Sequence, residues 1–317
     1  MEIRQLETFV SVAKNLNFSR AAEEINLSQP TISTHISALE NYLGLQLLIR
    51  NTKEVSLTKV GKDFLGFAQK ILAVRDQALH EIKGEDFNIR GNVDILASTI
   101  PAQYLLPEII ASFNLRWPNM IFHVEQADSR QVEREMSSFR YDFGMIGTVP
   151  DSSRFIHYPV CDDELVLILP NDTPQSPQSI REDFAGFIRQ VPFIMRESGS
   201  GTRAETENIF SKTGVDLHEM RIVAYFSDAN SILLAVSGGM GCALISRVAA
   251  AMYVNAGLLK QVEMESPIFH RQIYLLHNKE SQLSLVQQFF CEHVCRFYRK
   301  NAFSLPLGEK MQGLAAK

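Results

Sequence analysis

The first sixty residues carry apolar side chains at the three- and four-residue intervals of amphipathic helices, which predicts three short helices in succession. Ser19 is the predicted N-cap of the second helix and Ser28 that of the third, which Pro30 in its first turn favours and Gly44 ends. The apolar positions are Leu6, Phe9, Val10, Ala13 and Leu16 in the first helix, Ala21, Ala22 and Ile25 in the second, and Ile32, Ile36, Leu39 and Leu43 in the third.

The third helix has a polar outer face, and a short turn at residues 26–28 separates it from the second helix. Two short helices, a tight turn and a polar-faced helix make the helix-turn-helix pattern, whose last helix enters a DNA major groove. Gln29 and His35 can hydrogen-bond to base edges, and Thr31, Ser33 and Thr34 can reach phosphates or a thymine methyl group. The alternative is a small helical bundle whose polar face is incidental.

Two short extended pieces, residues 47–50 and 55–58, surround a polar tip and predict a β-hairpin wing. Arg50 and Lys53 lie where they can contact backbone phosphates, and such contacts fix the register of a protein on DNA and make binding salt-dependent.

A long helix is predicted from Thr58 to Lys83, about 39 Å at 1.5 Å per residue. Two adjacent apolar rows on so long a helix need a partner, and pairing with a second copy of the chain is the expected solution. The alternative is packing on its own downstream domain. Residues 84–91 are predicted to be a hinge. The rows are Phe64, Ala68, Ile71, Arg75, Ala78 and Ile82, and beside them Leu65, Leu72 and Leu79.

From Gly91 onward, aliphatic runs alternate with helical stretches, which predicts an α/β fold with parallel sheets. A second sheet is expected from Leu165, and residues 268–277 are expected to return the chain to the first sheet, so that two lobes enclose a cleft. The predicted strands are 93–97, 121–124, 143–146, 165–169, 222–225 and 243–245, and the predicted helices are 107–113, 130–139, 202–212, 228–237 and 247–255.

Four polar clusters follow predicted strands, and ligands of open α/β sheets bind at these carboxyl ends. Glycines before a helix start favour an anion, to which Arg196 or Arg203 can add charge, so we expect a small anionic effector, a carboxylate or an oxyanion. The alternative for the glycine-rich cluster is a tight loop with a capped helix. The candidate effector-binding residues are Ser98, Thr99, Ile100, Gln103, Gly147, Thr148, Ser198, Gly199, Ser200, Gly201, Thr202, Ser227 and Asp228.

Composition agrees with a globular protein: 317 residues, 45% hydrophobic, 21% charged, net charge −5. The charged N-terminus and the lack of a long apolar run argue against a signal peptide or a membrane partner, and four cysteines are expected to be reduced thiols of a cytoplasmic protein. Cys291, His293 and Cys295 share a helical stretch without a second ligand pair, so no metal site and no cofactor is expected. Familiar catalytic motifs are absent from the sequence, and no enzyme activity is expected.

The N-terminal motif resembles the winged helix-turn-helix of LysR-type transcriptional regulators. The resemblance rests on Phe18-Ser19-Arg20-Ala21-Ala22, Leu27-Ser28-Gln29-Pro30-Thr31-Ile32-Ser33, Ile36, Leu39-Glu40, Leu43-Gly44, Leu47-Leu48, Arg50 and Leu57-Thr58 with Gly61. It implies a dimerising linker helix and a periplasmic-binding-protein-like effector domain. Residues 97–107, 128–130 and 196–203 resemble the subgroup associated with sulfur or selenium metabolism. The candidate DNA-binding residues are Ser19, Arg20, Ser28, Gln29, Pro30, Thr31, Ser33, Thr34, His35, Arg50 and Lys53.

The expected organisation is therefore a DNA-binding domain at 1–58, a linker helix and hinge at 59–90, an effector domain at 91–305 and a flexible tail at 306–317. Within the effector domain, lobe I is expected at about 91–162 and 268–305 and lobe II at about 163–267. The expected function is an effector-responsive regulator that binds double-stranded DNA as a homodimer or homotetramer and contacts RNA polymerase. The alternative is an α/β small-molecule-binding protein or enzyme whose N-terminal helices only mediate association.

Overall fold

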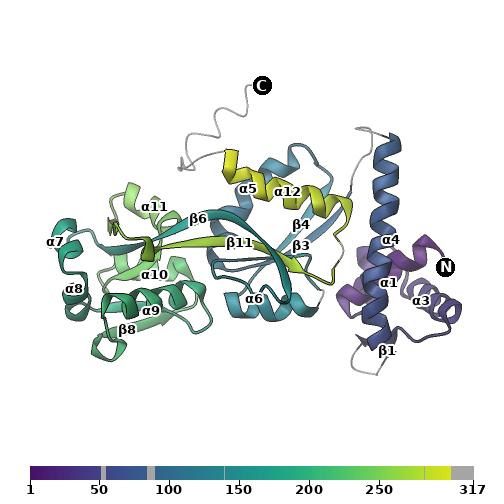
Figure 1. The fold of residues 1–317 in the computed structure, drawn as a ribbon, viewed down its shortest axis with the longest axis horizontal. Helices are drawn as coiled ribbons and strands as arrows, with labels where there is room; N and C mark the ends of the chain where they lie inside the picture. Colours follow the sequence, from purple (N-terminus) through teal and green to yellow (C-terminus); the bar gives the residue numbers. More distant parts are fainter. Residues whose placement is uncertain (51–54, 84–89, 139, 282, 301–317) are drawn as a thin grey trace.

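The computed structural model describes residues 1–50, 55–83, 90–138, 140–281 and 283–300. They form an N-terminal domain, a long helix α4 (Lys59–Lys83) and a two-lobed α/β region (Figure 1). The N-terminal domain contains the helices α1 (Ile3–Asn15), α2 (Phe18–Glu24) and α3 (Gln29–Leu43) and the hairpin strands β1 (Leu48–Arg50) and β2 (Val55–Leu57). The predicted wing tip at 51–54, with Lys53, and the predicted hinge at 84–89 and tail at 306–317 lie outside the described residues.

The predicted apolar stripes form the core of the N-terminal domain, with one exception. Leu6, Phe9, Ile32 and Ile36 are almost fully buried. Leu16, by contrast, is 41% exposed, because it is the C-cap of α1 and adopts a left-handed backbone that turns the chain outward.

The N-cap of the second helix lies two residues earlier than expected, so the prediction of Ser19 as N-cap was wrong. Asn17 is the N-cap, and its Oδ1 accepts hydrogen bonds from the amides of Ser19 at 2.9 Å and Arg20 at 3.1 Å. An asparagine side chain caps as well as a serine, and Asn17 lies in extended backbone directly before the helix. The prediction for α3 is confirmed, since Ser28 Oγ accepts from the amide of Thr31.

Helix α4 matches the predicted span, and its N-terminal part packs on α1. Thr58 Oγ1 accepts from the amide of Gly61, as an N-cap does, and a Cβ at Gly61 would collide with the carbonyl oxygen of Leu47. Leu65 and Ala68 are buried in the N-terminal core, whereas Phe67 and four other apolar side chains of the helix are exposed. Part of the apolar surface of α4 is thus buried against its own DNA-binding domain. The exposed set is Val60 (40%), Phe67 (61%), Ile71 (36%), Val74 (65%) and Ile82 (82%).

One seven-stranded sheet runs through both lobes in the order β10-β6-β11-β5-β3-β4, with β9 also paired to β6, and β7 and β8 form a separate pair. The strands are β3 (Gly91–Ala97), β4 (Met120–Gln126), β5 (Phe143–Ile146), β6 (Phe155–Pro170), β7 (Phe193–Arg196), β8 (Ile222–Phe226), β9 (Ala243–Ser246), β10 (Leu259–Val262) and β11 (His270–Asn278). Helices cover both faces of each lobe: α5 (Leu106–Asn114), α6 (Ser129–Glu135) and α12 (Leu285–Lys300) in lobe I, and α7 (Pro177–Glu182), α8 (Phe184–Gln190), α9 (Gly201–Thr213), α10 (Ala229–Ser237) and α11 (Arg247–Asn255) in lobe II.

The α/β fold class is confirmed, but the expectation of parallel sheets was only partly right. β3 pairs in parallel with β4 and β5, and β7 with β8, whereas β11 runs antiparallel to β5 and β6, and β9 and β10 run antiparallel to β6. The reason is that β6 and β11 are long strands that carry the chain between the lobes in opposite directions. β6 pairs with β11 up to Glu164 and with β9 from Leu165, next to the lobe boundaries expected at 163 and 268.

Several elements were not foreseen, namely the first half of β6, the short helices α7 and α8, the strand β10, and a π-helical turn at Pro101–Leu105 before α5. One predicted helix ends earlier: in place of helix 130–139 the chain forms α6 followed by a 3-10 turn at Met136–Ser138. No helix among the described residues is both long and apolar enough to cross a bilayer.

Candidate DNA-binding surface and effector site

Helix α3 lies on the side of the N-terminal domain that faces away from the α/β region (Figure 1). At its N-terminal end Gln29, Pro30 and Thr34 are exposed, and Thr31 and Ser33 are half-buried. Ile32 and Ile36 are fully buried on the opposite side. A helix held from one side by its core, with a short polar N-terminal face outward, has the arrangement that major-groove binding requires.

Hydrogen bonds within the domain restrain several of the predicted DNA contacts. His35 is half-buried and its Nδ1 is hydrogen-bonded to Thr8 Oγ1 of α1 at 2.9 Å, so its ring is anchored and does not project freely. Thr34 Oγ1 donates to the carbonyl of Pro30 at 3.0 Å. Gln29 keeps its amide nitrogen for a partner, since Ser19 donates to Gln29 Oε1. Gln29 is therefore the side chain of α3 best prepared to read a base edge.

Arg50 is positioned at the end of β1 by two contacts. Its Nη2 pairs with Glu40 Oε2 of α3 at 3.0 Å, and its guanidinium lies 5.1 Å from the ring centroid of Phe18. Glu40 Oε1 also accepts from the amides of Leu47 and Leu48, which ties the strand to the recognition helix. The guanidinium remains 39% exposed and can meet a phosphate beside the groove that α3 enters.

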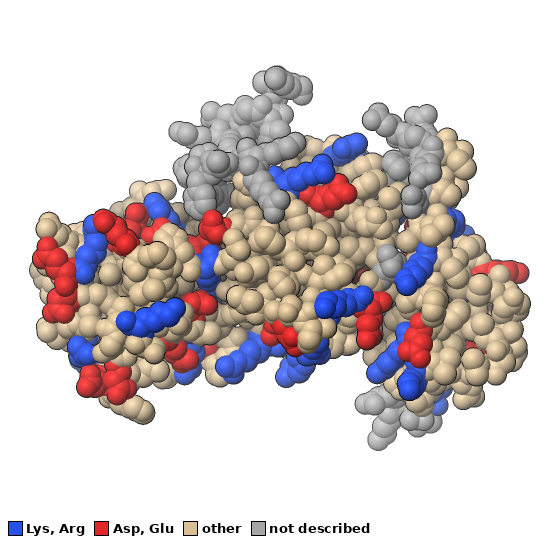
Figure 2. Space-filling view, in the orientation of Figure 1, with Lys and Arg blue, Asp and Glu red and all other residues tan. Residues whose placement is uncertain are grey.

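The visible face of the α/β region carries Lys and Arg side chains interspersed with Asp and Glu (Figure 2). A surface of mixed sign does not attract a polyanion over a broad area. The face of the α/β region seen in this view therefore presents no broad basic patch to DNA.

The predicted strand ends meet in a small cavity between the lobes, which has about 10 Å³ of free volume, enough for about one water molecule. Six of the predicted effector-site residues line it, and four residues that were not on the candidate list join them. The predicted six are Ser98, Thr99, Ile100, Gly147, Ser200 and Thr202. The additional four are Asp128, Ser129, Arg196 and Arg271.

The other predicted residues lie around this cavity without lining it. Gln103 bonds to Gln126 and Asn230, Ser227 accepts from Arg196 through its carbonyl, and Asp228 caps α10 through the amide of Ser231. Gly199, Gly201 and Thr148 lie where the two lobes meet, whereas Ser198 is exposed. The carbonyl of Gly199 accepts from the amide of Arg130, and a Cβ at Gly201 would lie 2.9 Å from Thr148 Cγ2.

Arg196, at the end of β7, is only 4% exposed and points into the cavity. Its Nε and Nη2 bind Glu197 at 2.7 and 2.9 Å, and Nη2 also donates to Thr99 Oγ1 across the cleft at 3.0 Å. This buried guanidinium therefore joins lobe II to lobe I and also lines the cavity between them.

Arg271 enters the cavity from β11 and was missed by the sequence analysis. Its Nε and Nη2 bind Asp163 at 2.8 and 2.7 Å, and its Nη1 donates to Thr202 Oγ1 at 3.2 Å. The signal was present in the sequence, because Arg271 alternates with Ile273 and Leu275 on the inner face of the strand. A charged residue at an inward position of a buried strand marks either an ion pair or a ligand contact.

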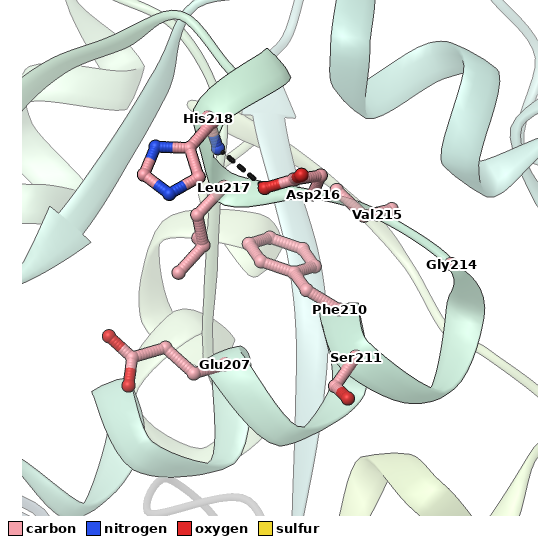
Figure 3. Close-up of a pocket in the computed structure, with 8 residues that line it drawn as sticks. All are labelled: Glu207, Phe210, Ser211, Gly214, Val215, Asp216, Leu217 and His218. Carbon is pink, nitrogen blue, oxygen red and sulfur yellow. Dashed lines mark hydrogen bonds between the residues drawn. The ribbon is translucent and has the colours of Figure 1, made fainter.

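A second pocket lies in lobe II at the end of α9, away from the cleft (Figure 3). It is an open depression with Phe210 and Leu217 at its floor and with Glu207, Ser211 and His218 around its rim. Its polar side chains are on the molecular surface, whereas those of the cleft are buried and converge from both lobes. The cleft is therefore the stronger candidate for the effector site.

The thiols of α12 do not form a reactive or metal-binding site in the described part of the chain. Cys291 is buried and Cys295 half-buried, and a hydrogen bond to Cys295 together with burial raises the pKa of the Cys291 thiol far above its usual value. No cluster of metal-ligating side chains occurs among the residues described. Thiols held in the protonated form in a core are inert packing groups.

Comparison with known proteins identifies both domains of the chain. Residues 3–62 match the family described as bacterial regulatory helix-turn-helix protein, lysR family, and residues 88–296 match the LysR substrate binding domain. The chain is 29% identical over 297 residues to an uncharacterized HTH-type transcriptional regulator of Methanocaldococcus jannaschii, covering 93% of this chain and 99% of that protein. It is 27% identical over 294 residues to the HTH-type transcriptional activator CmpR of Synechocystis, covering 92% and 94%.

Solved structures of low sequence identity share the fold. Full-length OxyR from Pseudomonas aeruginosa superimposes with a TM-score of 0.69 at 19% identity, over 94% of this chain and 95% of that one. The regulatory domain of Synechocystis CcmR in complex with 2-PG gives 0.58 at 23%, over 66% and 97%. Full-length CbnR complexed with its target DNA gives 0.53 at 21%, over 93% and 99%. The chain belongs to the LysR family and is a DNA-binding transcriptional regulator with an effector-binding domain.

Proposed function

We propose that this regulator is controlled by a small anion, a carboxylate or an oxyanion, bound in the cavity between the two lobes. The observation that carries the proposal is the convergence of two buried arginines, Arg196 and Arg271, with the hydroxyl groups of Ser98, Thr99 and Thr202. The first amides of α9 add donors, since the amides of a helix's first turn lack partners within the helix. The CcmR regulatory domain, which shares the fold, is recorded in complex with 2-PG.

The charges of the cavity walls favour a ligand with few charges. Arg196 is paired with Glu197 and Arg271 with Asp163, and the carboxylate of Asp128 also lines the cavity. The guanidinium groups are thus largely neutralised, and the hydroxyls and amides supply neutral donors. Each added charge on the ligand must be desolvated, so the monoanion glycolate should bind this cavity more readily than the multiply charged sulfate or 2-phosphoglycolate in the test below.

Entry of the effector requires the lobes to separate. The present cavity holds only about one water molecule, and hydrogen bonds close it: Arg196 to Thr99 at 3.0 Å, and Tyr104 to Asn230 at 3.0 Å. Opening breaks these bonds, and a bound effector replaces them with its own. Occupancy of the cavity then shifts the balance between two arrangements of the lobes.

The proposed mode of DNA binding requires two copies of the chain. A dimer would place its two α3 helices in successive major grooves, as two-fold helix-turn-helix dimers do. The exposed apolar row of α4, Phe67, Ile71, Val74 and Ile82, supports pairing through that helix. We also propose that the protein forms a homotetramer, contacts RNA polymerase and is located in the cytoplasm. The relative CbnR is recorded with its target DNA. The narrower link to sulfur or selenium metabolism stays a prediction.

The effector is tested by thermal unfolding of the full chain with sulfate, 2-phosphoglycolate and glycolate at matched ionic strength. Binding to the folded state raises the melting temperature, by an amount that grows with ligand concentration. Thr99→Ala and Thr202→Ala should remove the shift, and Arg181→Gln, on the surface of lobe II, should retain it. A shift that survives both cleft variants places the ligand elsewhere, and no shift with any small anion overturns the anionic effector.

DNA binding is tested by mapping bound genomic DNA and by retardation of the recovered operator at two salt concentrations with competitor DNA. A specific regulator retains its operator under competition, and raised salt weakens the complex. The mapped genes would also name the pathway and hence the anions to try next. Retention that disappears with any competitor would contradict sequence-specific binding.

A further inference from the structure

Lys14 joins the DNA-binding domain to lobe I of the effector domain. It lies in the last turn of α1, yet its ammonium group donates to Asp142 Oδ1 at 3.1 Å and Oδ2 at 3.0 Å and also pairs with Asp94. The side chains of Lys14, Asp94 and Asp142 are only 16%, 20% and 11% exposed. We call this group of three the interdomain cluster.

The two carboxylates of the interdomain cluster are held close together and can bind a cation between them. The amide of Asp142 donates to the carbonyl of Asp94 at 2.8 Å, and the amide of Asp94 donates to Asp142 Oδ2 at 2.8 Å, which holds the carboxylates side by side. Burial, opposed by Lys14 and aided by Asp94, raises the pKa of Asp142. Burial alone would lower the pKa of Lys14, but attraction by the two carboxylates outweighs it, and the net shift is upward.

A histidine also faces the interdomain cluster. His123 of β4 bonds through Nδ1 to Asp94 Oδ1 at 2.8 Å, and its ring is 55% exposed. Lys14 is the cation that lies between the carboxylates, and it comes from the other domain. Removal of Lys14 would leave two buried carboxylates side by side, which is costly.

The carboxylates also occupy a significant place in the sheet. Asp94 is in β3, four residues before Ser98, and Asp142 directly precedes β5, which ends just before Gly147. Ser98 and Gly147 line the effector cavity, so both strands have the interdomain cluster at one end and the cavity at the other. Four residues of strand span about 13 Å. The amide of Ser98 donates to the carbonyl of Met145 at 2.8 Å, which joins the two strands at the cavity end.

We propose that the interdomain cluster transmits the state of the effector cavity to the DNA-binding domain. The proposal rests on the proposed function of the cleft. A movement of β3 relative to β5 at the cavity alters the spacing of the two carboxylates that hold Lys14. Because Lys14 belongs to α1, which packs against α3, the orientation of the recognition helix relative to lobe I changes with it. The contact between the two domains thus has two arrangements, and both the state of the cavity and bound DNA shift the equilibrium between them.

The test follows amide hydrogen exchange in the full chain, without DNA or effector. Lys14→Met should accelerate exchange in the last turn of α1 and at the start of β3 by on the order of tenfold or more, because a buried charge loses its partner. The double variant Lys14→Met/Asp142→Asn also removes one of the two stranded carboxylate charges and guards against simple misfolding. Glu7→Gln is the matched control, since it breaks an ion pair between α1 and Arg75 of α4 that does not involve lobe I. Unchanged exchange in the Lys14 variants overturns the interdomain contact.

Transmission is tested by changing the cavity. Gly201→Ala places a methyl group 2.8 Å from Ser129 Oγ across the cleft and wedges the lobes apart, and Thr99→Val removes the bond to Arg196 as a second route. Either change should alter the exchange of α1 in the wild-type background and leave it unaltered in Lys14→Met/Asp142→Asn. An equal response in both backgrounds, or none in either, overturns the proposal. Neither result depends on the identity of the effector. A failure of the anion or operator tests can therefore be distinguished from a failure of this proposal.

Discussion

Arg271 and Asp163 face each other across the paired strands β11 and β6, at the point where the chain crosses between the lobes. Both side chains are almost fully buried, at 4% and 2% exposure. Asp163 also accepts a hydrogen bond from Ser246 at the end of β9, and Arg271 donates to Thr202 of α9. One ion pair thus connects the crossing strands, lobe II and the effector cavity.

Arg271→Met should destabilise the effector domain by about 3–5 kcal/mol, because it leaves the Asp163 carboxylate buried and uncompensated. Arg271→Met/Asp163→Leu should recover most of that loss, since a buried apolar pair carries no desolvation cost. Urea unfolding followed by tryptophan fluorescence and circular dichroism gives the comparison. Arg181→Met is the control: its ion pair with Glu265 is exposed, and its loss should cost less than about 1 kcal/mol.

Gln29→Ala should weaken operator binding by about 1–3 kcal/mol and relax the preference for one base pair, because the exposed amide at the start of α3 is the best-placed base reader. Quantitative retardation on the operator and on single-base variants measures both effects. Asn41→Ala, exposed near the other end of the same helix, should bind like the wild type. Equal losses for both variants would indicate that α3 does not enter the groove by its N-terminal end.

Arg50→Gln should weaken binding to all sequences alike and reduce the salt slope by about one unit, as expected for a lost phosphate contact. Affinities at four or more salt concentrations supply the slope. Because Glu40 loses its partner in this variant, the melting temperature is measured in parallel. An unchanged slope with a lower affinity would show that Arg50 acts only through its contacts with Glu40 and Phe18.

The N-terminal domain was foreseen almost completely, because its signals are local. The period of Leu6, Phe9 and Ile32, the cap at Ser28 and the glycine at 44 each act within a few residues. The N-cap of α2 was misplaced by two residues, since asparagine and serine both cap and the sequence offers one of each. The direction of β9, β10 and β11 could not be foreseen, because strand direction depends on pairing with β6 from as far as about a hundred residues away.

The effector site was foreseen where chemistry follows a strand end and missed where it lies within a strand. Ser98, Thr99 and Thr202 were recognised by position. Arg271 lies in a strand that the sequence analysis interpreted only as the return of the chain to the first sheet. The residues around Lys14 do not indicate that its partners are 80 and 128 residues away. Contacts of that separation are set by how domains pack, so an individual basic residue in an amphipathic helix gives no warning of them.

Stability should fall as the pH drops below about 6.5, because burial lowers the pKa of both His277 and His293 in the folded state. A histidine with a depressed folded-state pKa contributes stability above its unfolded pKa, and that contribution is lost as the pH falls through 6.5 toward the folded-state value. His277 is 4% exposed and lies in β11 with its Nδ1 near the carbonyl of Asn278. Each such group adds a slope of up to about 1.4 kcal/mol per pH unit.

His277→Gln should therefore flatten the dependence of the unfolding free energy on pH between 7 and 5 by up to one proton, as urea unfolding at each pH would show. His270→Gln, on the exposed side of the same strand, is the control and should leave the slope near that of the wild type. Taking the difference between variant and wild type removes the contribution of groups that titrate in the opposite sense, such as Asp142, whose pKa is raised. A slope that stays the same in His277→Gln would mean that His277 gains its proton equally in the folded and unfolded states.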